Sequence, residues 1–235
     1  MAVTYARMTS EVGLRVRALN ITTAASASAA YNAQTWKSAR FPVESVRDAL
    51  LNAVAHFAEV IAETANHPWR ILFAGTTGSL ADAAAIPSTV GGFPIIGVYG
   101  EVRDASDGRH CSPKGVTYIE RVKRLAYDDY CYAIVGAKIR HTRTNVVMDV
   151  CRYDAATERT AAGAAGAAGN MILPDTLEPA VVAHALANLV VTDEYQGQAG
   201  YYGAFAAAVA EQIRAGMTNV DATLKPAPQP AGRAE

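Results

Sequence analysis

The chain has 235 residues, of which 51% are hydrophobic, enough to bury the core of one large domain or two small ones. Its net charge of −1 gives no global argument for binding nucleic acid or a membrane surface, although it is compatible with a local charged patch. No run of eighteen apolar residues occurs, so we expect no membrane span. The first residues also lack the basic start and apolar run of a signal peptide.

Residues 1–40 predict an N-terminal arm that contains one short helix. Val12, Val16 and Leu19 share one helical face, and Ser10 is placed to cap the helix. The segment 22–30 has only small side chains and offers little to a core. It indicates an arm draped over the surface, or an arm that lies on a neighbouring subunit and is ordered by assembly.

The segment 41–68 gives the strongest pattern in the chain and predicts one long amphipathic helix. Pro42 suits the first turn, where a missing N–H costs little, and Glu44 lies where the helix dipole favours negative charge. Pro68 predicts the end, because the residue before a proline avoids the α conformation. Apolar residues recur every three or four positions and form one stripe, namely Val43, Val46, Leu50, Val54, Phe57 and Ile61.

Residues 69–153 predict a β-rich insert, because the hydrophobic period changes to that of strands. Asp107-Gly108 predicts a tight turn, and a second hairpin is expected across residues 140–145. The glycine-rich turn at 75–79 lacks the lysine of a Walker loop and the GxGxxG fingerprint, so we expect no nucleotide there. The strand candidates are 69–73, 95–99, 116–122, 131–137 and 146–153.

The last third of the chain predicts a linker, two helices and a tail. Residues 154–172 contain an alanine–glycine repeat without bulky side chains and indicate a Gly/Ala linker. Residues 173–216 predict a pair of amphipathic helices, with Gly216 suited to the position just after the second. Residues 217–235 are rich in proline and predict a disordered tail.

These elements together predict an α+β fold. Its main part is an antiparallel helical bundle, made of the long helix and the C-terminal helix pair, whose apolar stripes bury one another. The β-rich hairpin insert projects from that bundle.

The search for a catalytic set gives weak candidates. Glu101, Asp104 and Asp107, with His110, are the best set for a metal-dependent hydrolase, but arginines stand among these acids and favour a solvated turn. No GxSxG or HExxH motif occurs. We therefore expect a non-enzymatic protein without catalytic residues, metal or cofactor.

The histidines and cysteines do not change this expectation. His56, His67 and His184 lie beside apolar positions and are interpreted as structural residues. The cysteines are spaced twenty residues apart without a CxxC pair, so we interpret them as reduced thiols and do not favour a zinc site. They are Cys111, Cys131 and Cys151.

A basic cluster in the β-rich insert is the best candidate for a contact surface. On a hairpin it would meet DNA phosphates or an acidic protein partner. The alternative is a solvated sheet edge that cations protect from aggregation. The cluster consists of Arg121, Lys123, Arg124, Lys138, Arg140 and Arg143.

Two stretches of the chain resemble the head-to-tail adaptor (connector) proteins of tailed bacteriophages. The first is FPVESVRDALLNAVAHFAEVIAE followed by HPWR. The second is LPDTLEPAVVAHALANLVV with YYGAFAAAVAEQIRAG, which is similar to the closing helix pair of such adaptors. Together they cover about a third of the chain.

The resemblance implies a structural virion protein that is assembled in the host cytoplasm. In that family a helical bundle docks beneath the portal ring, and hairpins or loops reach towards the tail. The subunits form a ring, usually twelvefold, around the channel for double-stranded DNA. The implied partners are therefore further copies of the chain, the portal protein, tail or nozzle proteins and the passing DNA, with no membrane.

The resemblance also gives the C-terminal tail a role, because such tails commonly insert into portal clefts. The candidate portal-docking residues are Lys225, Pro226, Pro228 and Pro230. Two alternatives stay open. One is a ring at the tail-completion or terminator position, and the other is the metal-dependent hydrolase.

Overall fold

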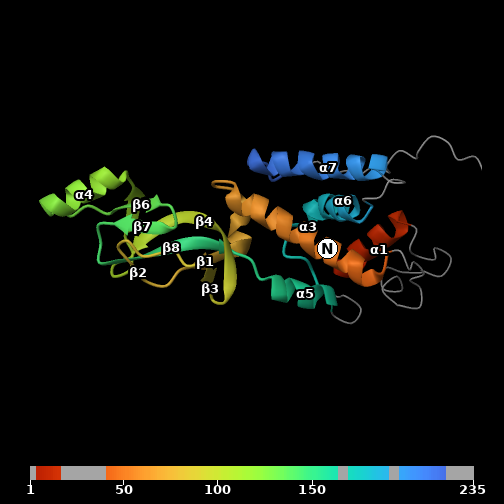
Figure 1. Cartoon of the computed structure of the whole chain (residues 1–235), viewed down its shortest axis with the longest axis horizontal. Helices are drawn as coiled ribbons and strands as arrows, with labels where there is room; N and C mark the ends of the chain where they lie inside the picture. Colours follow the sequence, from red (N-terminus) through yellow and green to blue (C-terminus); the bar gives the residue numbers. More distant parts are fainter. Residues whose placement is uncertain (1–3, 17–40, 164–168, 191–195, 221–235) are drawn as a thin grey trace, which may run out of the picture. The chain divides into compact units, whose positions relative to one another are not determined.

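The computed structural model describes residues 4–16, 41–163, 169–190 and 196–220. The chain divides into two compact units (Figure 1). The helical unit is built from both ends of the chain, Met1–Thr64 and Asp154–Glu235, and the β unit is Ala65–Tyr153. The β unit is thus inserted, in sequence, between the halves of the helical unit.

The helical unit is organised around its longest helix. α6 packs against both α3 and α7, while α1 and α5 also pack against α3. In the part that the structure describes, its elements are α1 (Tyr5–Arg15), α3 (Val43–Glu63), α5 (Ala155–Gly163), the 3-10 helix η3 (Asp175–Leu177), α6 (Glu178–Leu189) and α7 (Gln196–Arg214).

α3 confirms the predicted long helix, because the predicted apolar stripe is its buried face. The helix begins at Val43, so Pro42 occupies the capping position and not the first turn. It ends at Glu63, before the predicted stop at Pro68, where the Thr64 hydroxyl donates back to the Val60 carbonyl at 2.7 Å. Five stripe residues are fully buried, namely Val46, Leu50, Val54, Phe57 and Ile61.

α1 begins earlier than the predicted N-terminal helix. Its cap is Thr4, whose hydroxyl accepts the Arg7 N–H at 3.3 Å. Ser10, the predicted cap, lies inside the helix and donates to the Ala6 carbonyl at 2.7 Å. The predicted surface arm at 22–30 lies outside the described residues.

Residues 155–163 form α5, so the predicted Gly/Ala linker is wrong for this part. Asp154 starts the helix by accepting the Thr157 N–H at 2.8 Å. Glu158 is buried, and the Tyr5 hydroxyl donates to its Oε2 at 2.5 Å. Alanine is a strong helix former, and this long-range contact supplies the packing that the repeat lacks by itself.

We expect Tyr5→Phe to lower the free energy of unfolding by about 1–2 kcal/mol, because a buried acceptor loses its donor. Burial raises the pKa of Glu158 and the Tyr5 hydrogen bond opposes that rise, so the pKa should rise further in the variant. Urea unfolding at pH 7 measures the loss. Tyr127→Phe, which removes an exposed hydroxyl, is the control, and equal effects in both variants would contradict the prediction.

The C-terminal helix pair is confirmed as α6 and α7. α7 ends at Arg214, and Gly216 occupies the predicted position just after it, with φ +80°. The Gly216 N–H donates to Ile213 O at 2.8 Å, and the Met217 N–H donates to Gln212 O at 3.0 Å. These two bonds form a Schellman cap, in which a residue without Cβ adopts the left-handed conformation at no steric cost.

The β unit begins with the 3-10 helix η1 (Pro68–Phe73), so the predicted strand at 69–73 is wrong. His67 caps this turn by accepting the Trp69 N–H on Nδ1 at 3.2 Å, and Pro68 favours a helical first position. The strands that follow are β1 (Ala74–Thr76), β2 (Leu80–Ala81), β3 (Thr89–Val90), β4 (Phe93–Asp104), β5 (His110–Pro113), β6 (Cys131–Val135), β7 (Lys138–His141) and β8 (Asn145–Arg152).

The strands form one mixed sheet of eight strands, in the order β1-β8-β4-β5-β6-β7. β2 also pairs with β8, and β3 pairs with β4. All pairs are antiparallel except β5 with β6. β4 is the longest strand, and two register shifts against β8 mark irregularities that help a sheet to bend.

Residues 83–86 hydrogen-bond to the far edge strand β7 and to the residue just before it. Ala83 N donates to Ile139 O at 2.9 Å, and Ile86 N donates to Ala137 O at 2.8 Å. β2, which comes just before this segment, pairs with β8, so the two sides of the sheet are drawn together into a half-barrel. Its interior is filled by Leu80, Val102, Cys111, Ile139, Val146, Met148 and Val150.

The predicted fold class is therefore wrong as stated. The middle of the chain is a large curled mixed sheet and not a small hairpin insert on an antiparallel helical bundle. Strands of two or three residues, such as β1, β2 and β3, are too short to show a period of two. Their place in the sheet comes from pairing with β8 and β4, which a local pattern does not reveal.

Residues 116–125 form α4 (Val116–Leu125), so the predicted strand there is also wrong. Ile119 and Val122, three positions apart, are buried against Cys131 and Ala133 of β6. The parallel pairing of β5 with β6 explains this helix, because parallel neighbours need a crossover connection and cannot be joined by a tight turn.

α4 ends at Leu125, and its C-cap Ala126 adopts the left-handed conformation with φ 51° and ψ 34°. We expect Ala126→Gly to raise the free energy of unfolding by about 0.5–1 kcal/mol, because glycine has no Cβ penalty there. Thermal unfolding measures the change. Ala204→Gly, in the exposed interior of α7, is the control with the opposite expected sign.

Candidate functional site

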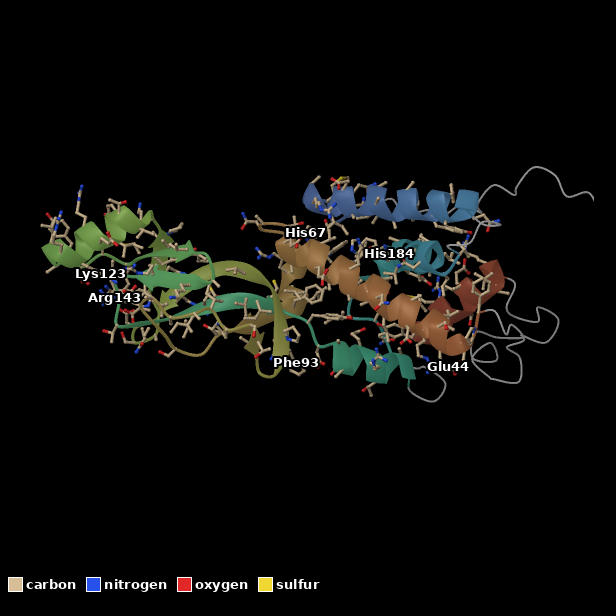
Figure 2. The ribbon with its side chains drawn as sticks, viewed as in Figure 1. Glu44, His67, Phe93, Lys123, Arg143 and His184 are labelled. Carbon is tan, nitrogen blue, oxygen red and sulfur yellow. The ribbon has the colours of Figure 1, made fainter. Side chains whose placement is uncertain are left out.

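The six predicted contact residues lie on neighbouring elements of the β unit, and Figure 2 labels two of them, Lys123 and Arg143. They do not form one uniform basic surface, because half of them are paired with carboxylates of the same unit. Arg121, Lys123 and Arg124 lie on α4, Lys138 and Arg140 on β7, and Arg143 on the turn between β7 and β8.

Asp82, just after β2, holds two of these cations. Its carboxylate lies 2.6 Å from Lys123 Nζ and 3.3 Å from Arg140 Nε, and it accepts the His141 N–H at 2.9 Å. Partial burial raises the pKa of Asp82, but the bonds from Lys123 and His141 and the two positive charges outweigh it and lower the pKa to about 2. These two cations therefore join α4 and β7 to the end of β2.

Asp104 and Arg143 form a second, more buried ion pair. Asp104 is 4% exposed, and Arg143 Nε donates to it at 2.6 Å. Ser106 donates to the same carboxylate from Oγ at 2.5 Å and from its backbone N at 2.7 Å. The Ser106 hydroxyl is the largest cause that lowers the pKa of Asp104 to about 2, against burial, with further lowering by the Ser106 N–H and Arg143.

Tyr130 extends this network to the turn between β4 and β5. The Arg143 guanidinium lies 3.9 Å from the ring centroid and that of Arg109 lies 5.4 Å from it. The Tyr130 hydroxyl donates to Asp107 at 2.7 Å. Cation–π contacts and charge-assisted bonds thus brace the β4–β5 turn against the β7–β8 turn.

The acids considered for a hydrolase are part of this brace and do not converge on one point. Asp104 is engaged by Ser106 and Arg143, Asp107 accepts from Tyr130, and exposed Glu101 lies 3.6 Å from exposed His110. Among the residues that the structure describes, no group of three or more His, Cys, Asp or Glu side chains is arranged to hold a metal ion. The geometry is that of a braced turn.

The exposed side of α4 carries two cations of the predicted cluster, Arg121 and Arg124, and is available to a partner. Tyr118 is 37% exposed and Leu125 is 47% exposed. Lys114 Nζ and the Arg121 guanidinium lie 5.7 and 5.9 Å from the Tyr118 ring centroid, and the Tyr118 hydroxyl donates to Asp129 at 2.8 Å. We call this surface the α4 face, and it comprises Lys114, Tyr118, Arg121, Arg124 and Leu125.

Sequence reasoning missed Lys114, Tyr118 and Leu125 because it assigned this segment to a strand. On a helix Tyr118, Arg121, Arg124 and Leu125 return to one side at steps of three, four and seven residues, and Lys114 lies just before α4, with its ammonium group over the Tyr118 ring. The helical period was therefore the signal that would have found them.

Two histidines of the helical unit form a further cluster of titratable groups. The rings of His56, on α3, and His184, on α6, stack with centroids 4.4 Å apart and planes 14° apart. Burial is the main cause that lowers both pKa values. The pKa of His184 falls to about 4, and the charge of Arg214 helps to lower that of His56 against Glu59 and Glu63. Figure 2 labels His184 on α6.

The three cysteines are free and buried in the β unit. Burial raises the pKa of all three thiols, that of Cys111 to about 11. Because the thiolate is the nucleophile and the metal ligand, such thiols are unreactive at neutral pH.

Comparison with known proteins gives no family for this chain: no family model matches it, and no curated protein matches its sequence. None of the described helices is both long enough and apolar enough to cross a membrane. The candidate portal-docking residues Lys225, Pro226, Pro228 and Pro230 lie outside the described residues.

Proposed function

We propose that this chain is a non-enzymatic assembly protein of the virion, a head-to-tail adaptor whose copies form a ring beneath the portal of a tailed bacteriophage. The observation that carries the proposal is the α4 face. It sets exposed Tyr118 and Leu125 among three cations, on a helix whose other side is buried on the sheet. A surface that mixes aromatic, aliphatic and arginine side chains is typical of protein interfaces.

The organisation of the helical unit supports the same reading. The segments that resemble the adaptor family are α3, α6 and α7, and they pack on one another although they come from opposite ends of the chain. The helical unit would serve as the body of each ring subunit, and the inserted β unit would supply contacts to a neighbour, the tail or the passing DNA.

The ring is tested by measuring particle mass. Mass photometry and negative-stain electron microscopy of the protein, alone and mixed with purified portal rings, should show closed rings or a complex that contains many copies. A monomer that stays monomeric at all concentrations and ignores the portal would contradict the proposal. Binding to tail tubes instead of portal rings would move the protein to the tail-completion position.

A further inference from the structure

The two units of the chain carry opposite charge. The β unit has eleven lysines and arginines against eight aspartates and glutamates, a net charge of +3. The whole chain has a net charge of −1, which leaves −4 for the residues of the helical unit. A homo-oligomer in which unlike surfaces meet head to tail benefits from this asymmetry, whereas a contact between like surfaces does not.

A row of the helical unit's carboxylates lies on the solvent side of α3. Glu44, Asp48, Glu59 and Glu63 are exposed, and spacings of four and eleven residues return them to one side of the helix. We call this row the α3 acidic stripe, and Figure 2 labels Glu44 at its beginning. Asp48 already lies 3.4 Å from Arg159 of α5. Within the described residues, Glu59 and Glu63 form no ion pair.

The α4 face carries exposed positive charges of the β unit that are complementary to the α3 acidic stripe. Within the described residues, Lys114, Arg121 and Arg124 form no ion pair, and the first two lie over the Tyr118 ring. α4 has ten residues and is about 15 Å long, which is about half the length of α3. One α4 face therefore fits against the unpaired end of the stripe, at Glu59 and Glu63.

We propose that the α4 face of one copy docks on the Glu59–Glu63 end of the α3 acidic stripe of the next copy. This inference rests on the proposed function and identifies the contact that closes the ring. Arg121 and Arg124 face the two carboxylates, while Tyr118 and Leu125 supply the apolar part of the interface. We favour a second copy over DNA because exposed apolar side chains lie among the cations and because an unpaired acidic surface exists on the same chain.

Charge reversal with rescue tests this contact. Arg121→Glu combined with Arg124→Glu, and separately Glu59→Lys combined with Glu63→Lys, should each weaken self-association at least about tenfold, because like charges then face each other. The protein that carries all four changes should associate again, since the pairing is restored with opposite sign. Sedimentation velocity at low and high salt measures the association, and salt should weaken it in the wild type.

Lys138→Glu is the matched control, because it reverses an exposed cation of the β unit outside the α4 face. It should leave association within about twofold of the wild type. Rings that form normally in the reversed variants would overturn this contact while leaving the adaptor function standing. A wild type without any self-association, alone or on portal rings, would overturn both. Loss of duplex DNA binding in the Arg121→Glu, Arg124→Glu protein, without any change in self-association, would assign the α4 face to DNA.

Discussion

Asp104→Ala is expected to lower the free energy of unfolding of the β unit by about 3 kcal/mol, because it leaves the partly buried Arg143 guanidinium without its buried carboxylate partner. Asp104 is 4% exposed and accepts three hydrogen bonds, from Arg143 and twice from Ser106. The variant removes all three and loosens the turn between β4 and β5. Unfolding in guanidinium chloride, followed by a probe in the β unit, measures the change.

Asp128→Ala provides the matched control. Asp128 contacts the same arginine at 2.5 Å but is 77% exposed, so solvent screens the pair and we expect a loss below about 1 kcal/mol. A double-mutant cycle with Arg143→Ala isolates the Asp104–Arg143 coupling. Similar losses for both aspartates would show that burial does not decide the strength of this network.

The Asp104 contribution also has a defined pH range. The pKa of Asp104 is lowered to about 2 from an ordinary value of 3.8, so the folded state holds its proton less tightly than the unfolded state does. The contribution is therefore complete above about pH 4 and is lost as the pH falls towards 2. The Asp104→Ala variant should therefore not show this decrease in stability between about pH 4 and pH 2.

The stacked histidines are expected to make the helical unit less stable as the pH falls. This loss begins at a higher pH than the loss from Asp104. The pKa of His184 is lowered to about 4, below the ordinary value of 6.5, and that of His56 is lowered too. Between about pH 6.5 and pH 4 the histidines of the unfolded chain take up protons that those of the folded chain do not. Stability is thus complete above about pH 6.5 and declines as the pH falls towards 4. We expect the free energy of unfolding to fall by about 1–2 kcal/mol over this range, since both rings are only half-buried.

His184→Gln separates this effect from that of the carboxylates. Burial raises the pKa of Glu158 and Glu178, and these groups favour the folded state as the pH falls. The quantity to compare is therefore the difference between wild type and variant, measured by urea unfolding from pH 7.5 to 4.5. The variant should lose less stability than the wild type across this range. Parallel profiles would show that the stack does not titrate.

Charged side chains near His56 can link its protonation to self-association. Glu59 and Glu63 raise the pKa of His56 and Arg214 lowers it, although burial is the largest cause. If Glu59 and Glu63 are buried against a neighbouring copy, protonation of His56 and self-association become linked. Assembly of the wild type should then change with pH in the same range.

The sequence by itself determined the helices whose stripes are long and complete. α3 can be predicted from its own residues, because each turn adds an apolar side chain to the same stripe, and Gly216 marks the end of α7 by local conformation alone. It also identified the basic cluster, since charge is visible without a fold. The period of α4 was present in the sequence too, but the surrounding strands led to a strand assignment.

Only the tertiary structure decided the rest, because the interactions concerned join residues far apart in the chain. β1, β2 and β3 exist through pairing with β8 and β4, and α5 is fixed by the bond from Tyr5 to Glu158. The division of the basic cluster into paired and unpaired cations depends on Asp82 and Asp104, which lie about forty residues or more before their arginines in the sequence. A charge is encoded locally, but whether it is neutralised depends on which carboxylate the fold brings within hydrogen-bonding distance.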